Sequence, residues 1–190
     1  MTTTEPIEFI AFLGQRQIAA GSRRDVARAA WQAHHDGEPG LIVLDAAESR
    51  PVEFDLRGDL ETALARLPAE QEPDRRGPGR PKLGVVAREV TLLPRHWEWL
   101  ATQPGGASVA LRKLVEDARR SMSGQDRKRQ SQGVALRFMT TMAGNLAGYE
   151  DATRALFAGD QARFNTLTDP WPADIRDHTR RLATGAFAEA

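Results

Sequence analysis

The sequence has 190 residues, 41% hydrophobic and 27% charged, which is the composition of a folded globular protein and excludes a largely disordered or collagen-like chain. It contains no cysteine, so disulfides, thiolate metal sites and a cysteine nucleophile are excluded. Charge is unevenly placed: residues 1–72 carry 7 basic and 13 acidic side chains, residues 73–137 carry 14 and 6, and residues 138–190 carry 5 and 7. The basic middle favours an anionic partner for that segment.

Residues 1–67 are predicted to form a small α/β domain. Short β-rich or apolar runs alternate with two segments of helical periodicity, and Ser22 is placed to cap the first helix. The order β-β-α-β-β-α is that of a β-grasp-like roll. We expect strands at 7–13, 16–21, 41–44 and 52–56, and helices at 22–34 and 60–67.

Two polar segments divide the rest of the chain. Residues 68–84 are rich in proline, glycine and basic side chains and are predicted to be a linker, because they offer no large apolar side chains to a core until their end. Residues 121–133 contain Gly124 and the basic run 127–129 and are predicted to be a second, polar linker. Residues 134–190 are expected to form several short helices.

The segment 85–120, between the two linkers, has the pattern strand, helix, turn, helix. Residues 85–92 alternate as a strand, Pro94 suits the first turn of a helix, and Pro104-Gly105-Gly106 ends that helix. Ser108 is placed to cap the second helix, which carries Leu111, Leu114, Val115 and Ala118 on one face. About 35 residues of this kind do not close a hydrophobic core. We therefore expect a homodimer formed through residues 85–120.

This pattern resembles the ribbon-helix-helix family of bacterial DNA-binding proteins. The resemblance implies that paired strands enter the major groove and that the start of the second helix contacts phosphate. Val90 and Leu92 then face the core, whereas Glu89 and Thr91 face the groove. The apolar spacing of the second helix and the inward parity of Arg88 depart from the family. The alternative is an ordinary strand–helix–helix piece of a larger α/β core.

Just before this segment, Pro78-Gly79-Arg80-Pro81-Lys82 is similar to the core of an AT-hook, with Pro78 where an arginine is usual. Arg75 and Arg76 precede it. Such a motif places arginine in a narrow minor groove, where the negative potential is deepest.

Together these patterns predict a dimeric, sequence-specific, double-stranded-DNA-binding protein, a bacterial transcriptional regulator. No apolar run reaches the roughly 18 residues of a membrane span and no signal-peptide pattern opens the chain, so we expect a cytoplasmic location and no membrane partner. The alternative is a protein–protein interaction module whose basic centre docks an acidic partner or the acidic N-terminal domain. The predicted DNA contacts are Arg75, Arg76, Arg80, Lys82, Arg88, Glu89, Thr91, Ser108, Arg112 and Lys113.

Enzyme signatures are not found. The sequence has no Walker A loop, Gly-x-Ser-x-Gly elbow, His-Glu-x-x-His motif or Rossmann glycine fingerprint, and we expect no catalytic residue, cofactor or metal site. His34-His35-Asp36 is predicted to be a polar helix end. The charged segment around His178 is predicted to be a solvated helix face. The aromatic and methionine side chains of the C-terminal region are predicted to lie in the core: Phe138, Met139, Met142, Phe157 and Phe164.

Nearly the whole chain resembles the bacterial family known as domain of unknown function 2239. The resemblance lies in residues 79–86, in residues 93–100 followed by 104–108, and in Trp171-Pro172-Ala173-Asp174. The family name implies no function.

Overall fold

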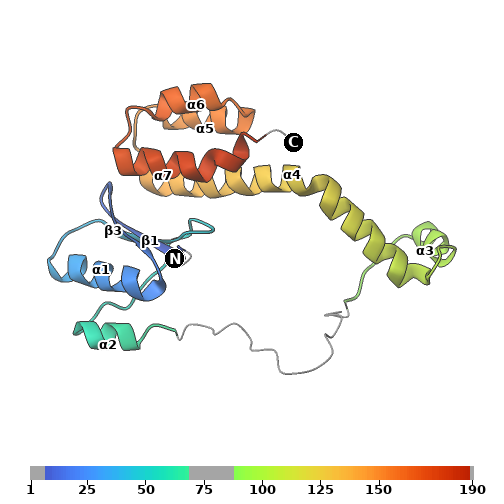
Figure 1. Ribbon diagram of the computed structural model, residues 1–190, viewed down its shortest axis with the longest axis horizontal. Coiled ribbons are helices and arrows are strands. Elements are labelled where there is room, and N and C mark those ends of the chain that lie inside the picture. The colour runs from blue at the N-terminus through green and yellow to red at the C-terminus, as the bar shows by residue number, and fades with distance from the viewer. Residues whose placement is uncertain (1–6, 69–87, 189–190) are drawn as a thin grey trace, which may run out of the picture. The chain divides into compact units, whose positions relative to one another are not determined.

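The computed structural model describes residues 7–68 and 88–188 of the chain. Within them it has one three-stranded antiparallel sheet and seven α-helices, which confirms the predicted α+β class (Figure 1). The chain divides into two compact units. The first joins the residues up to Pro68 with those from Gly124 onwards, and the second contains the described residues 88–123. Helix α4 (Gly106–Ala143) begins in the second unit and ends in the first.

The sheet has the order β2-β1-β3, formed by β1 (Phe9–Leu13), β2 (Arg16–Gly21) and β3 (Leu41–Asp45). The central strand β1 is buried on both faces, because Phe9 and Ala11 belong to one cluster of buried side chains and Ile10 and Phe12 to another. Helix α1 (Arg23–His35) covers the first of these faces (Figure 1). It begins after Ser22, as predicted, and the Oγ of Ser22 accepts a hydrogen bond from the Asp25 N–H at 3.2 Å.

The predicted fourth strand at 52–56 is not formed. The chain makes an isolated bridge between Leu44 and Pro51 and one further hydrogen bond, from the Val52 N–H to the Val43 carbonyl at 2.8 Å. The alternating side chains have another use: Val52, Phe54 and Leu56 pack on the cluster beneath α1. The alternation of apolar and polar residues therefore shows which side chains are buried, but it does not show that the segment pairs with a neighbouring strand. The next helix, α2 (Leu60–Ala65), is capped by Asp59.

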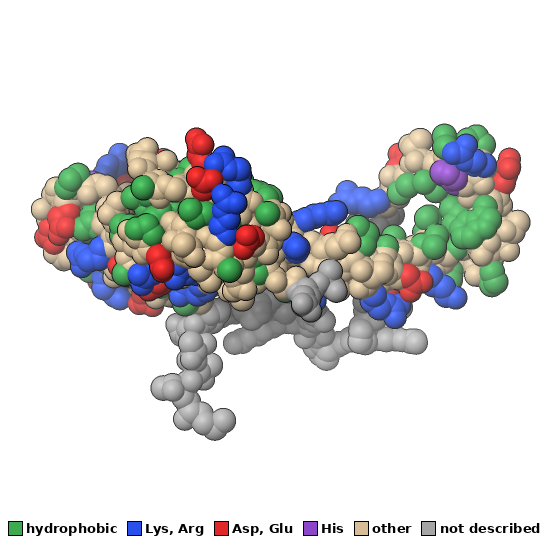
Figure 2. Space-filling model, turned by 90° about the horizontal axis from the view of Figure 1, so that it is seen from above, with side chains coloured by type: hydrophobic (Ala, Val, Ile, Leu, Met, Phe, Trp, Pro, Cys, Tyr) green, Lys and Arg blue, Asp and Glu red, His purple; other side chains and the backbone are tan. Residues whose placement is uncertain are grey.

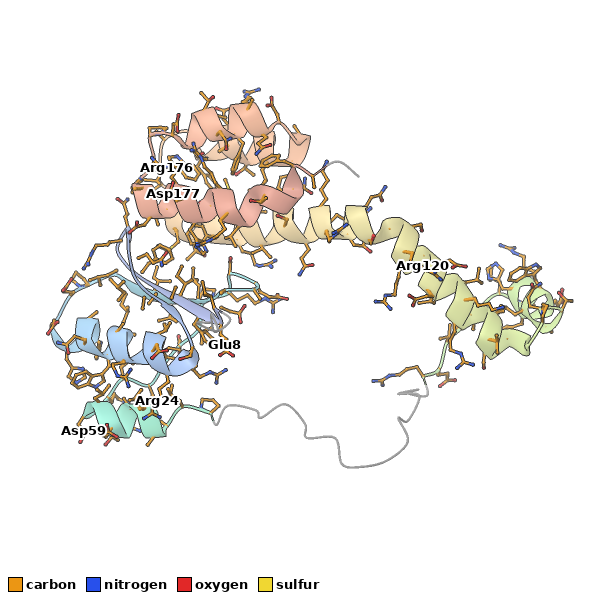
Figure 3. The ribbon with its side chains drawn as sticks, viewed as in Figure 1. Glu8, Arg24, Asp59, Arg120, Arg176 and Asp177 are labelled. Atoms are coloured by element: carbon orange, nitrogen blue, oxygen red, sulfur yellow. The ribbon has the colours of Figure 1, made fainter. Side chains whose placement is uncertain are left out.

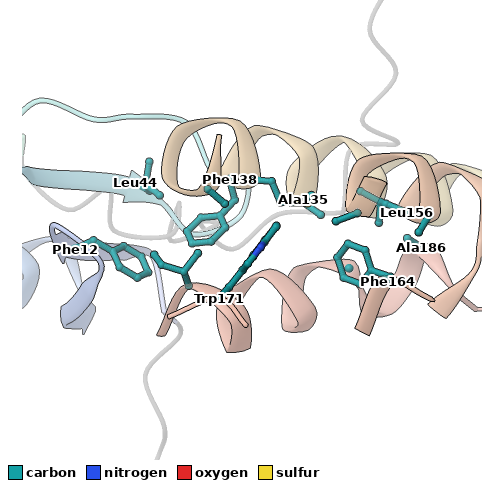
Figure 4. Packing of buried hydrophobic residues seen from close by; sticks show 14 of the residues in the cluster. Phe12, Leu44, Ala135, Phe138, Leu156, Phe164, Trp171 and Ala186 are labelled. Carbon is teal, nitrogen blue, oxygen red and sulfur yellow. The ribbon is translucent and has the colours of Figure 1, made fainter. Parts of the chain in front are cut away.

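The C-terminal helices share a core with the sheet. They are α5 (Tyr149–Ala158), α6 (Gln161–Thr168) and α7 (Ala173–Ala183), followed by the 3₁₀ turn η1 (Thr184–Ala186). Figure 4 shows the shared core, in which side chains of the sheet meet those of α4 to η1: Phe12, Leu44, Ala135, Phe138, Leu156, Phe164, Trp171 and Ala186. The prediction of separate regions at 1–67 and 134–190 is thus corrected. A sheet buried on both faces needs a second covering layer, and the C-terminal helices provide it.

Residues 121–133 are helical, contrary to the predicted polar linker, and lie within α4. The physical reason is that polar residues such as Gln, Arg and Lys are good helix formers, and one glycine costs a helix only about 1 kcal/mol. The Ser121 hydroxyl donates to the Ala118 carbonyl, and Arg129 forms an ion pair with Asp126 at 3.8 Å. The polar composition of residues 121–133 indicated correctly that most of them are exposed, but an exposed segment can still be helical.

The segment around His178 also differs from its prediction as a solvated face. His178 is 5% exposed, and its ring lies 4.4 Å from the ring of Phe138 and 5.8 Å from that of Phe12, centroid to centroid. One turn earlier, the Asp174 carboxylate accepts a hydrogen bond from the Gln17 N–H of β2 at 2.8 Å. The surface of α7 carries instead the exposed ion pair of Arg176 and Asp177 (Figure 3).

Candidate nucleic-acid interface

The second unit is a helical hairpin that follows an extended segment. Helix α3 (Pro94–Ala101) starts at Pro94, as predicted, and the turn after it contains Gly105 and Gly106, with φ of +84° and +75°. A Cβ atom at Gly105 would lie 3.1 Å from Val109, so this turn needs glycine for space as well as for its backbone angle. These local signals place α3 and α4 against each other.

Ser108 does not cap α4. The helix already begins at Gly106, so Ser108 is its third residue, and the Ser108 carbonyl accepts a hydrogen bond from Nε of Arg112 at 3.1 Å. A cap at Ser108 implies a helix that begins at Val109, and the turn glycines allow α4 to start three residues earlier, at Gly106. Ser108 remains exposed in the first turn of α4.

The hairpin does not close a core of its own. Of residues 88–123 only Leu100 and Ala110 are buried. An open apolar cavity of about 270 Å³ lies between Leu92, His96, Trp99, Leu100, Leu111 and Leu114. Figure 2 shows hydrophobic atoms exposed over the part that holds α3. Seven large apolar side chains of the unit are 40–57% exposed: Val90, Leu93, Trp97, Trp99, Leu114, Val115 and Met122.

The extended segment before α3 carries the residues predicted to contact bases. Residues 85–87 lie outside the described residues, and residues 88–92 have no strand partner within the described chain. Arg88, Glu89 and Thr91 are all exposed, whereas Leu92 is half-buried and lines the cavity. The polar side chains of this segment are therefore accessible to a partner.

Basic side chains follow at the start of α4. Arg112 and Lys113 are exposed and have no ion pair within residues 7–68 and 88–188. Further along the helix, Arg119 and Arg120 pair with Glu116 and Asp117 at 3.2 and 3.1 Å. The uncompensated positive charge of α4 within this unit thus lies near its N-terminus, where backbone N–H groups also favour anions.

Four predicted contacts cannot be placed. Arg75, Arg76, Arg80 and Lys82, which include the AT-hook-like motif, lie outside the described residues. The site that the structure describes is the extended segment with Arg88, Glu89 and Thr91, together with the first turns of α4.

Sequence reasoning placed Leu111, Leu114, Val115 and Ala118 on one apolar face but missed Met122, which is also exposed. The signal for Met122 was present in the spacing of Leu111, Val115, Ala118 and Met122, which alternates steps of four and three residues. The predicted linker at 121–133 cut this pattern short.

Other features of the described residues do not form a competing site of known chemistry. A cavity of about 310 Å³ lies beside Phe54 and Arg66, and one of about 410 Å³ lies at the turn before α5. No group of three or more His, Asp or Glu side chains in the described parts of the chain is arranged to hold a metal ion. None of the helices described is both long and apolar enough to cross a bilayer.

Comparison with known proteins gives one match. The family model described as "Uncharacterized protein conserved in bacteria (DUF2239)" matches residues 8–183. No curated protein and no solved structure matches the chain.

Proposed function

Since this chain belongs to the DUF2239 family of bacterial proteins, whose description assigns no activity, we propose from its second unit that it is a homodimeric, sequence-specific DNA-binding protein, a cytoplasmic transcriptional regulator. One observation carries the proposal. The same 36 residues combine an apolar side that is left open with a polar segment and a basic helix start that are both exposed.

In this proposal, the extended segments of two chains pair across a two-fold axis, as in ribbon-helix-helix proteins. Such a ribbon fits the major groove of B-DNA. Thr91, and with it Arg88 and Glu89, then faces base edges, where the Glu89 carboxylate accepts from a cytosine amine. The pairing also supplies the hydrogen-bond partners that residues 88–92 lack within the described single chain.

The phosphates are held by the start of α4. Its first backbone N–H groups, the Ser108 hydroxyl and the side chains of Arg112 and Lys113 provide donors and positive charge. Arg75, Arg76, Arg80 and Lys82 extend this contact into the neighbouring minor groove. Phosphate contacts set affinity and orientation, and the contacts of the extended segment set sequence preference.

A docking module for an acidic protein is the second candidate, because the exposed basic residues would serve it equally well. Its intramolecular form loses support, since residues 7–68 are packed with the C-terminal helices. The whole first unit, residues 1–68 and 124–190, carries 16 basic and 19 acidic side chains, so its net charge is only −3. An acidic partner would have to be another molecule.

The test is selection of duplexes from a random-sequence pool by the full chain, followed by titration of enriched and scrambled duplexes. We expect enrichment of a sequence with two-fold symmetry. The double variant Arg112→Ala/Lys113→Ala should lose affinity for every duplex, whereas the control Arg154→Ala, on α5, should not. If nothing is enriched and the parent binds duplex no better than a neutral protein at about 50 mM salt, the DNA proposal is wrong.

A further inference from the structure

The first half of α4 has an apolar side that continues past the hairpin. Leu111, Val115, Ala118 and Met122 follow one another at steps of four, three and four residues, which places them along one side of a helix. Leu114 lies beside them. We call these five residues the α4 stripe. Within the single chain, Leu114, Val115 and Met122 are exposed.

The opposite side of the same helical segment is charged. Lys113 and Arg120 are seven residues apart, and about two turns of helix bring them to the same side, away from the α4 stripe. Arg120 is exposed on α4 (Figure 3) and pairs with Asp117. The helix is thus amphipathic, and beyond the cavity lined by Leu111 and Leu114 its apolar side is exposed at Val115 and Met122, which indicates a partner molecule.

The exposed apolar area of the second unit is close to the area that one stable protein partner buries. At about 150–250 Å² for a large apolar side chain, the seven partly exposed residues of the second unit offer roughly 600–700 Å². A stable interface of standard size buries about 800 Å² on each partner. The exposed apolar area of these 36 residues is therefore close to the area that one partner of similar size would bury.

A second copy of the chain fits this surface. The unit carries both an apolar cavity, between Trp99 and Leu111, and apolar side chains outside it, such as Val90 and Val115. A two-fold rotation brings the protruding residues of each copy to the open surface of the other. The charged residues that flank the stripe are Arg112 and Arg119, and Arg119 is already paired with Glu116 at 3.2 Å, so among the described residues a second copy meets one uncompensated flanking charge per helix and not two.

We propose that α4 pairs with the α4 of a second copy along the α4 stripe, and that this helix pairing, which extends to Met122, holds the dimer together. The role of this dimer rests on the proposed function, because a DNA-binding dimer needs its two reading segments fixed to each other. The helix pairing itself is inferred from the exposed apolar surface alone. Pairing of the extended segments then adds to a dimer that the helices already form.

The absence of cysteine from the natural sequence makes the test direct, because one introduced cysteine is the only thiol in the chain. Val115→Cys and Ala118→Cys place it on the stripe, and Arg120→Cys places it on the opposite side of the same helix. Without DNA and under mild oxidation, we expect the two stripe variants to form covalent dimers in high yield at low micromolar concentration. Arg120→Cys should remain largely monomeric on a non-reducing gel. Equal yields at all three positions would overturn the pairing.

A charge on the stripe gives a second, non-covalent test. Because Val115 is exposed within one chain, Val115→Glu leaves the chain's own core intact, and circular dichroism should show the parent's helix content. We expect the dimer dissociation constant to rise by about 30-fold or more, as for loss of a central interface contact. Arg120→Glu, the matched control, should change it by less than about 5-fold. Sedimentation of the unmodified chain as a monomer at about 50 μM would also overturn the proposal.

The two proposals fail in different ways. A dimer cross-linked through the stripe that selects no duplex would contradict the DNA function and leave the helix pairing in place. A chain that binds a selected duplex with one protein per duplex, and does not cross-link through Val115 or Ala118, would contradict the helix pairing alone.

Discussion

The imidazole of His178 lies inside the core of the first unit, between the rings of Phe12 and Phe138. Burial, together with the positive charge of Arg181, which also contacts its Nδ1, lowers the pKa of His178 from its ordinary 6.5 to about 4. The folded protein therefore holds His178 neutral at a pH where the unfolded chain binds a proton.

This difference predicts how stability depends on pH. The unfolded state binds more protons than the folded state between pH 6.5 and about 4, so stability falls as the pH is lowered through this range. Between pH 7.5 and 5 we expect a loss of about 2 kcal/mol from this group. Urea unfolding of the parent and of His178→Gln at both pH values checks this. The variant should show the smaller change, and a parent equally stable at both pH values would contradict the prediction.

We predict that a single residue, Thr91, contributes to the DNA sequence preference of the protein. It is exposed beside Leu92, and Thr91→Val keeps its shape while removing the hydroxyl. If the hydroxyl contacts a base edge, discrimination at that base pair should fall by about 1–3 kcal/mol, or roughly 5- to 150-fold. Base contacts release few counterions, so the salt dependence should not change. Thr166→Val, on α6, is the matched control, and an unchanged preference in the Thr91 variant would remove Thr91 from the reading surface.

Among the elements, the start of α4 is the one that we propose to set the affinity for DNA. Each phosphate contact that is lost makes the slope of log affinity against log salt shallower by about 0.9. A dimer of the Arg112→Ala/Lys113→Ala variant loses up to two contacts per chain, so we expect a change of up to about 4 in the slope, with the preferred sequence unchanged. Fluorescence anisotropy between about 50 and 200 mM salt measures it. An unchanged slope would mean that α4 does not contact phosphate.

Local signals predicted several elements because the responsible residues act on their immediate neighbours. Ser22 caps α1, Pro94 starts α3, and Gly105 with Gly106 forms the turn to α4, each through contacts within a few residues. The hairpin of the candidate site could therefore be predicted from the sequence.

The elements that differed depend on distant contacts. Residues 52–56 alternate as a strand does, but their apolar side chains meet the core under α1 instead of extending the sheet. His178 is buried because Phe12, far away in sequence, packs against it. In residues 121–133 helix-forming polar residues carry α4 through a segment whose composition suggested a linker. For residues 52–56 and for His178, contacts with distant residues determined the structure. For residues 121–133, the helix propensity of the polar residues determined it.

At the scale of the whole molecule, the first unit consists of two chain segments that share one core. The sheet is buried on both faces, and the side chains on its second face are covered by helices from the other end of the chain. Phe138 of α4 occupies the centre of this arrangement, fully buried and 5.5 Å from the ring of Phe12, centroid to centroid (Figure 4). Neither segment has a complete core without the other.

This shared core predicts that strand and helices lose stability together. Phe138→Ala removes a ring at their junction and should cost about 3–5 kcal/mol. Hydrogen exchange should then become faster for the amides of β1 as well as for those of α7, because both open in the same transition. Phe157→Ala, the same substitution at a half-exposed position on α5, should cost less than about 1 kcal/mol and leave both regions protected. If Phe138→Ala exposes the helices while β1 keeps its full protection, the two segments fold separately, and the sheet must be stabilised by α1 alone.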